Sequence, residues 1–327
     1  MLDAFRALGG VADNILIGSS GLGLHAQDPA TPVSLIVPPN LCFAVDDIDF
    51  IDGDIGLKDC ANVGPGERIF FETYARAFSW GARGGAETAR FVASLDALPS
   101  EVRWLLENQF VMPYLFQGDP AERTKERYLS SRHFRWNDRA WFVPIAELAR
   151  HGERTLTPAM DSNRRFYIQG TVQGEVLVSR GEYDTLGVYF TFGIVEAQNR
   201  AYSLPVSFRG GAADLHIWRD TTRIVKRDRF SLPEVTRDEQ SVTFSFLMTG
   251  HLKAPRLSRG IFLDLARGAP IDKPDETFDR VLFVNRQRLL ELLALLDPLH
   301  GEAVTALRKV AQVQLERISH CIGTRDL

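Results

Sequence analysis

The strands that this sequence predicts are short, and they fall into two groups separated by a stretch with helical periodicity. Residues 15–43 contain apolar runs broken by glycines and by a pair of prolines, and residues 141–179 repeat that pattern. Short strands joined by glycine turns are typical of small antiparallel sheets. Because helical patterning fills the gap between the two groups, we predict a β-rich α+β fold with a helical insertion at about residues 60–130.

Helical patterning is clearest in the insertion and near the end of the chain. Four stretches of the insertion are expected to form helices: residues 67–80, 86–98, 99–110 and 122–130. Two apolar stripes, Leu289–Leu296 and Val304–Ile318, are separated by Pro298 and Gly301. The stripes predict a terminal helical hairpin, and most such stripes are simply core.

Composition excludes several classes of function. With 38 basic and 42 acidic residues the net charge is −4, so the chain lacks the basic excess of most nucleic-acid-binding proteins. Cys42, Cys60 and Cys321 are widely spaced, without the paired spacing of a disulfide framework or a zinc site. No leader-like or membrane-spanning run is evident. We expect a cytoplasmic protein that binds neither nucleic acid nor membrane.

Three segments contain patterns that indicate a function. The first, Ser20–Ala26, reads SGLGLHA, and its two glycines allow backbone to pass close to a ligand, although a tight hairpin would use them equally well. It lacks the third glycine of a dinucleotide-binding motif. The second joins Ser131–Phe134 to Val143–His151. The third runs from Gly174–Gly181 to the sequence NRAYSL that begins at Asn199. No metalloprotease, hydrolase or phosphate-loop motif is present.

In this order and spacing, the three segments resemble the SET domain of the Rubisco large-subunit lysine methyltransferase branch. The resemblance runs from about Gly18 to Phe208 and includes a helical insertion where the family has one. It implies a SET domain over residues 1–208, built as a pseudoknot of short sheets, which is an exception to the usual unthreaded connections. Residues 209–327 would form a C-terminal region for substrate or partner binding. S-adenosylmethionine would be the cofactor, and a protein lysine or a small-molecule amine would be the acceptor.

The resemblance also implies which residues bind S-adenosylmethionine. Backbone groups of the first segment would line the site: Ser20, Gly21 and Leu22. Arg132 matches an arginine that pairs with the methionine carboxylate, a task that suits a bidentate guanidinium. Glu147 matches an acidic residue near the cofactor's amino group, and Arg150–His151 replaces an Asn-His pair. Each residue also has a structural reading: a salt bridge for Arg132, a solvated helix position for Glu147 and a core histidine for His151.

The chain departs from the family at the catalytic tyrosine, whose position is occupied by Arg180. A second pocket tyrosine is replaced by Phe192. The attacking amine must be neutral, and an ordinary lysine has a pKa near 10.4, so a cation pointing into the channel would oppose lysine binding and favour an anionic group. Tyr183, Tyr189 and Tyr167 are the tyrosines that could replace the missing one. The candidate catalytic residues are Arg180, Tyr183 and Tyr167.

Three functions therefore remain open. The first is an S-adenosylmethionine-dependent methyltransferase acting on a lysine or another amine. The second is a SET-derived enzyme with altered chemistry on an anionic small molecule in a biosynthetic pathway, as the altered tyrosine positions suggest. The third is a non-catalytic SET-fold module that holds a protein partner through its C-terminal helices.

Overall fold

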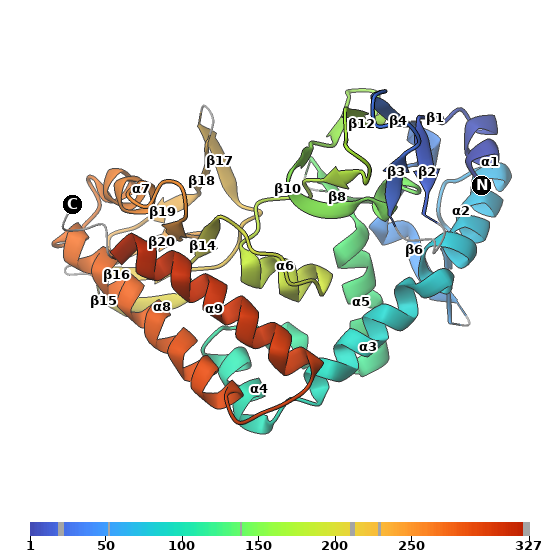
Figure 1. Cartoon of the computed structure of the whole chain (residues 1–327). Coiled ribbons are helices and arrows are strands. Elements are labelled where there is room, and N and C mark those ends of the chain that lie inside the picture. Colours follow the sequence, from blue (N-terminus) through green and yellow to red (C-terminus); the bar gives the residue numbers. More distant parts are fainter. Residues whose placement is uncertain (19–22, 52, 138, 210–212, 228–229, 323–327) are drawn as a thin grey trace. The chain divides into compact units, whose positions relative to one another are not determined.

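The computed structural model describes the chain except for residues 19–22, 52, 138, 210–212, 228–229 and 323–327 (Figure 1). The described chain divides into two compact units. The first unit contains Met1–Val92 and Asp119–Arg180, and the second contains Ala93–Gly118 and Gly181–Leu327.

The first unit is built from small sheets. A four-stranded antiparallel sheet has the strand order β1 (Val11–Asp13), β4 (Val33–Val37), β12 (Phe166–Gly170) and β11 (Ala159–Met160). The other sheets are β5 (Phe43–Ala44) with β9 (Arg139–Phe142) and β8 (Phe134–Trp136), β2 (Ile15–Ile17) with β3 (Leu24–Ala26), β6 (Ile48–Ile51) with β7 (Asp54–Leu57), and the parallel pair β10 (Arg150–Leu156) with β13 (Leu177–Val178). Pairing of β4 with β12 and of β5 with β9 joins the two halves of this unit, which are far apart in the sequence.

Helices α1 (Leu2–Ala7), α2 (Pro65–Phe78) and α5 (Pro120–Arg132) belong to the first unit, and α3 (Gly85–Asp96) spans the boundary after Val92. Helix α2 begins with a proline, whose missing N–H is unneeded in the first turn. Phe71 of α2 is fully buried between the rings of Phe43 and Phe142, at centroid distances of 4.8 and 5.6 Å. Aromatic packing thus joins helix and sheet in the core. The short helices are η1 (Pro39–Leu41), η2 (Val45–Asp47) and η5 (Ala146–Leu148), together with a π-helical turn, η3 (Trp80–Gly84).

The second unit combines helices with a four-stranded sheet in the order β15 (Val206–Arg209), β16 (Asp214–Ile217), β20 (Ser241–Phe244) and β19 (Val235–Arg237). Strands β16 and β20 are parallel. Two further pairs are β14 (Arg200–Tyr202) with β21 (Met248–His251) and β17 (Ile224–Arg227) with β18 (Phe230–Pro233). The helices are α4 (Ser100–Asn108), η4 (Pro113–Leu115), α6 (Thr185–Phe192), α7 (Leu257–Ala266), α8 (Pro274–Leu296) and α9 (Glu302–Ile322).

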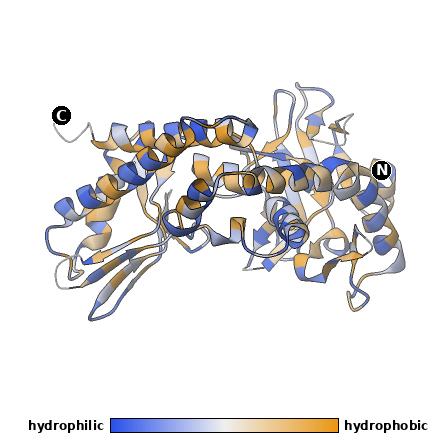
Figure 2. Cartoon of the chain, turned by 90° about the horizontal axis from the view of Figure 1, so that it is seen from below, coloured by the Kyte–Doolittle hydropathy of each residue, from blue (hydrophilic) through white to orange (hydrophobic). Residues whose placement is uncertain are grey.

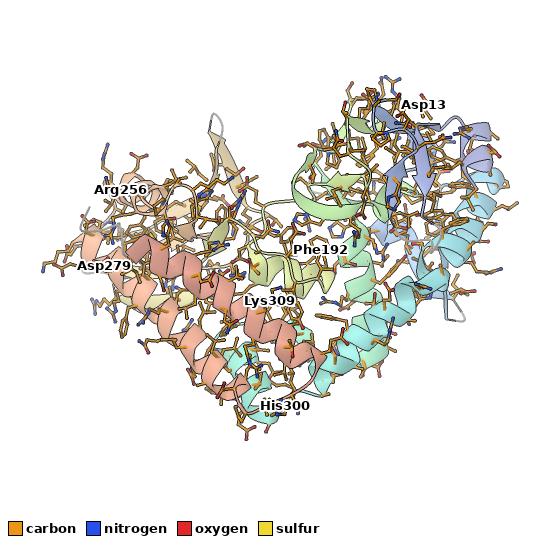
Figure 3. The ribbon with its side chains drawn as sticks, viewed as in Figure 1. Asp13, Phe192, Arg256, Asp279, His300 and Lys309 are labelled. Carbon is orange, nitrogen blue, oxygen red and sulfur yellow. The ribbon has the colours of Figure 1, made fainter. Side chains whose placement is uncertain are left out.

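The two C-terminal helices pack against each other and form the hairpin that the sequence predicts. Figure 2 shows both hydrophobic and hydrophilic residues along them, and the apolar positions Leu289, Leu292 and Leu307 are fully buried. Helix α8 begins at Pro274, well before the predicted stripe. The stripe did not reveal the first half of the helix because that half has a more polar sequence. Arg259 of α7 pairs with Asp279, labelled in Figure 3, on that first half.

One glycine sets how closely β21 approaches α9. A Cβ added to Gly250 would lie 2.6 Å from the carbonyl carbon of Arg317, where backbone has little room to move. We expect Gly250→Ala to lower the free energy of unfolding by about 1–3 kcal/mol, measured by urea denaturation. Gly260→Ala is the matched control, because Gly260 lies within α7 and an added Cβ meets no atom within 4 Å. It should be neutral or stabilising by up to about 1 kcal/mol. Equal effects of the two changes would contradict this prediction.

The α+β class and the richness in short sheets are confirmed. Helices α2 to α5 lie where the insertion was expected. The apolar sequence of Tyr189–Val195 predicts the end of a helix that leads into a strand, but the chain from Gly193 to Asn199 is irregular. The compact units divide after Arg180 rather than after residue 208; compactness does not test a family domain boundary, so that boundary stays a prediction. Among the described helices, none is long and apolar enough to cross a membrane.

Candidate functional site

Parts of the three sequence segments, including only the beginning of the third, meet in the first unit. The amide of Ala26 donates to the carbonyl of Gly174, and the amide of Val176 donates to that of Leu24, both at 2.7 Å. Strand β13 then pairs in parallel with β10, with His151 opposite Val178. The first segment therefore lies beside the third, which in turn lies beside the end of the second.

An ion pair marks the place where these segments meet. The guanidinium of Arg150 donates from Nε and Nη2 to the two carboxylate oxygens of Glu175. Gly23, at φ +81°, lies directly against this carboxylate: an added Cβ would be 3.2 Å from Oε1 of Glu175. Gly23 thus supplies both the left-handed backbone and the space that the pair needs. Because the Arg150 side chain is 62% exposed, the pair itself adds little stability.

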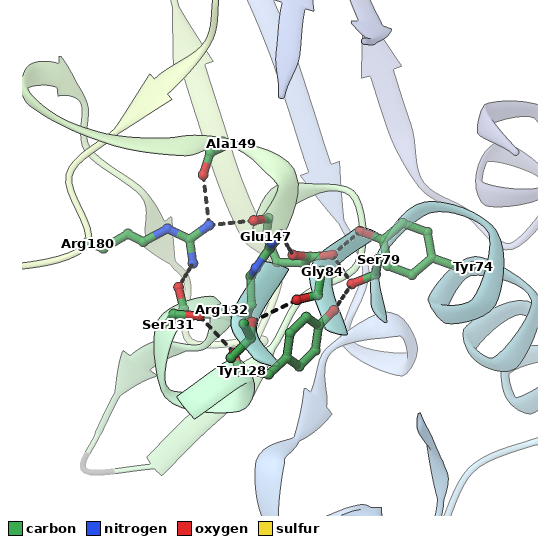
Figure 4. A network of polar contacts seen from close by, with 10 residues as sticks. Tyr74, Ser79, Gly84, Tyr128, Ser131, Arg132, Glu147, Ala149 and Arg180 are labelled. Carbon is green, nitrogen blue, oxygen red and sulfur yellow. Dashed lines mark hydrogen bonds and ion pairs between the residues drawn. The ribbon is translucent and has the colours of Figure 1, made fainter. Parts of the chain in front are cut away.

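The most buried charge of the first unit belongs to Glu147 on η5. Its side chain has no exposed surface, and its two oxygens accept three hydrogen bonds (Figure 4). Tyr74 and Ser79 donate to Oε1 from their hydroxyls at 2.5 Å each, and Nη1 of Arg132 donates to Oε2 at 2.7 Å. A buried carboxylate is tolerated only when it is paired and hydrogen-bonded in this manner. These partners differ from the ligand amino group that the family resemblance implies for Glu147.

Arg132 is the member of this network that reaches the surface. It is the last residue of α5, and 18% of its side chain is exposed. Its guanidinium lies 5.3 Å from the ring centroid of Tyr128. Burial lowers the pKa of the guanidinium, but the charge and hydrogen bond of Glu147, together with the phenols of Tyr128 and Tyr74, outweigh burial and raise the pKa above its usual value. Within the part of the chain that the structure describes, only Nη1 of Arg132 hydrogen-bonds to protein, which leaves donors for an anion.

The π-helical turn after α2 brings Ser79 to Glu147. The amide of Gly84 donates to the carbonyl of Ser79, five residues earlier, and the widened turn directs the Ser79 hydroxyl to both Glu147 and Tyr128. A Cβ on Gly84 would lie 2.7 Å from the ring of Tyr128, so only glycine fits here. Such insertions are frequent at functional sites.

Burial raises the pKa of Tyr74 well above its ordinary value, and the negative charge of Glu147 raises it further. The same two causes, in the same order, raise the pKa of Tyr128. Both phenols therefore remain protonated at neutral pH. The Tyr74 hydroxyl is a donor to Glu147, and the Tyr128 hydroxyl shares a hydrogen bond with Ser79.

Arg180 is directed toward backbone oxygens. Nη1 donates to the carbonyl of Ser131 at 3.2 Å, and Nη2 donates to the carbonyls of Glu147 and Ala149 at 2.6 and 2.8 Å (Figure 4). Its guanidinium also lies 4.6 Å from the ring centroid of Phe134. If Arg180 bound an anionic substrate, as one hypothesis from the sequence requires, its guanidinium would point toward that ligand. In the structure it points toward backbone carbonyls of the protein.

The remaining predicted residues have separate surroundings. His151 is buried, and its Nδ1 lies 3.4 Å from the amide nitrogen of Arg180. Tyr167 donates to Asp161 at 2.8 Å, on the face of β12 opposite the buried Phe166. Tyr183 belongs to the second unit, where its ring packs edge-on against Phe192.

The remaining three predicted cofactor residues, Ser20, Gly21 and Leu22, lie outside the described part of the chain. The cofactor and catalytic roles given to the predicted site residues stay predictions.

Sequence reasoning did not identify the partners of these residues: Tyr74, Ser79, Tyr128 and Glu175. One signal was available, since Gly81, Gly84 and Gly85 interrupt the helical pattern just after Ser79 and indicate an irregular turn. Glu175 lies in the third segment, but the sequence pattern assigns it no role. Nothing in the sequence indicates that Tyr74 is a partner of Glu147, because the two are separated by 73 residues.

No protein-family model matches this chain. No curated protein matches it either. Similar solved structures include a crystal structure of the SET domain of LSMT bound to lysine and AdoHcy, with a TM-score of 0.43 and 13% sequence identity, covering 98% of this chain and 89% of that chain. A structure of Rubisco LSMT bound to AdoMet has a TM-score of 0.44 and 13% identity, with the same coverage of 98% and 89%.

Proposed function

We propose that this protein binds S-adenosylmethionine at the site around Arg132 and transfers its methyl group to an amine, either a protein lysine or a small molecule. The observation that supports the proposal is the Arg132–Glu147 pair. In this pair the buried carboxylate of Glu147 orients the partly exposed guanidinium of Arg132. The family resemblance implies that the arginine at this position binds the carboxylate of the ligand's methionine part. A guanidinium can bind such a carboxylate through two parallel hydrogen bonds.

The residues of this site fit the carboxylate of the ligand better than its amino group. Arg132 retains donors that no described residue uses, whereas the Glu147 carboxylate is fully buried and accepts three hydrogen bonds. In this proposal, Glu147 therefore orients Arg132 instead of touching the ligand. When bound, S-adenosylmethionine supplies an electrophilic methyl group. The protein would hold the ligand, exclude water and lower the acceptor's pKa by desolvating it.

The test is calorimetric titration of the full chain with S-adenosylmethionine and S-adenosylhomocysteine. We expect Arg132→Ala to weaken binding about 10- to 100-fold, the value of a charge-assisted hydrogen bond. Because alanine leaves Glu147 unpaired, Arg132→Lys is made in parallel. Lysine retains the ion pair but loses the bidentate geometry, and it should also weaken binding.

Arg76→Ala is the matched control, since Arg76 forms an ion pair with Asp54 in which both side chains are largely exposed. It should bind like the unmodified protein. Transfer of a labelled methyl group to lysine, to small amines or to lysine-containing proteins then tests the reaction. If neither ligand binds the unmodified protein, the proposed function is wrong, and the non-catalytic alternative becomes the leading hypothesis.

A further inference from the structure

The guanidinium of Arg180 connects two segments of backbone that both lead into the proposed site. One of its carbonyl partners belongs to Ser131, the residue before Arg132. The others belong to Glu147 itself and to Ala149, the residue before Arg150. A single side chain thus bonds to the backbone next to both members of the Arg132–Glu147 pair.

The carbonyls that Arg180 binds are of a kind that needs an outside donor. The last carbonyls of a helix have no amide of their own helix to accept from. The Ser131 carbonyl belongs to the last turn of α5, which ends at Arg132, and the Glu147 carbonyl belongs to the three-residue helix η5, which is followed by Ala149. A cation at a helix C-terminus also interacts favourably with the helix dipole. The planar guanidinium can satisfy several such oxygens at once.

We infer that Arg180 is a positioning residue, which fixes the end of α5 against η5 and so sets the distance and orientation of the Arg132–Glu147 pair that would hold the ligand. This inference rests on the proposed function for its ligand, but its contacts are independent of it. Arg180 acts through the backbone of Ser131, Glu147 and Ala149, without touching the ligand. Arg180, which occupies the expected position of the catalytic tyrosine, would therefore hold the backbone of the site in place.

The test combines two measurements on the full chain, with Arg180→Ala, Arg180→Lys and the control Arg76→Ala. The first is the affinity for S-adenosylhomocysteine, with and without added methylguanidinium. The second is amide hydrogen exchange of residues 131–134 and 147–151 without ligand. Arg180→Ala should weaken binding by about tenfold or more, because a small misplacement of binding groups has large effects. It should also speed exchange in both segments, and methylguanidinium should partly reverse both changes.

Arg180→Lys keeps the charge but presents only one nitrogen, so its effects should lie between those of alanine and the unmodified protein. It also replaces the alanine variant if that variant does not fold. Unchanged affinity and unchanged exchange in the Arg180 variants would overturn the inference, and so would faster exchange with full affinity. If the unmodified protein binds no ligand, the proposed function fails, and exchange alone then decides whether Arg180 fixes the two segments.

Discussion

Replacing Glu147 with alanine should lower the free energy of unfolding by about 3–5 kcal/mol, the usual effect of removing one partner from a buried ion pair. The Glu147 side chain has no exposed surface, and its loss would leave Arg132, Tyr74 and Ser79 without their acceptor. The measurement is urea denaturation of the full chain followed by circular dichroism.

Two variants sharpen the Glu147 experiment. Glu72→Ala removes a carboxylate of the same unit whose side chain is 45% exposed and 4.0 Å from Arg68, so it should cost less than about 1 kcal/mol. Glu147→Gln keeps the size and one carbonyl oxygen but removes the charge, and should be less harmful than alanine. A loss below about 1 kcal/mol for Glu147→Ala would show that the network in Figure 4 does not hold the carboxylate as described.

In the second unit, Asp184→Ala should have an effect of similar size, again about 3–5 kcal/mol. The Asp184 side chain has no exposed surface and caps the first turn of α6 by accepting from the amide of Gly187 at 2.8 Å. Its other oxygen accepts from the amide of Tyr202 at 2.9 Å and from Nε2 of Gln314 at 2.6 Å. Arg219 completes the set as an ion-pair partner. One carboxylate thus links α6, β14 and α9, so its removal breaks a cap and a buried network together.

The control for Asp184 is Glu234→Ala in the same unit. Glu234 pairs with Arg223 on the surface, where the two side chains are 42% and 54% exposed, so its loss should cost less than about 1 kcal/mol. Both variants are measured by urea denaturation, with amide exchange of residues 185–192 as a local probe of α6. If exchange in α6 is unchanged in Asp184→Ala, the capping role assigned to this carboxylate is wrong.

Local patterns succeeded where a structural element is defined by its own residues. The two apolar stripes predicted the second half of α8 and helix α9. Pro298 and Gly301 between the stripes predicted the turn of their hairpin. Glycine-broken apolar runs predicted the short strands β2, β3 and β4. The irregular chain after α6 was misassigned because Gly193 to Asn199 contains apolar residues but no strand pairs with it in the described chain. Apolar composition alone does not reveal whether a strand will find a partner.

The sequence by itself determined the α+β class, the helical stretch and the terminal hairpin. These follow from periodicity and turn chemistry, which are properties of neighbouring residues. Only the tertiary structure decided that Glu147 faces Arg132, Tyr74 and Ser79, and that Arg180 binds backbone carbonyls. The physical reason is that a buried charge is stabilised by whichever donors the fold brings within hydrogen-bond distance, and those donors come from residues far away in the chain.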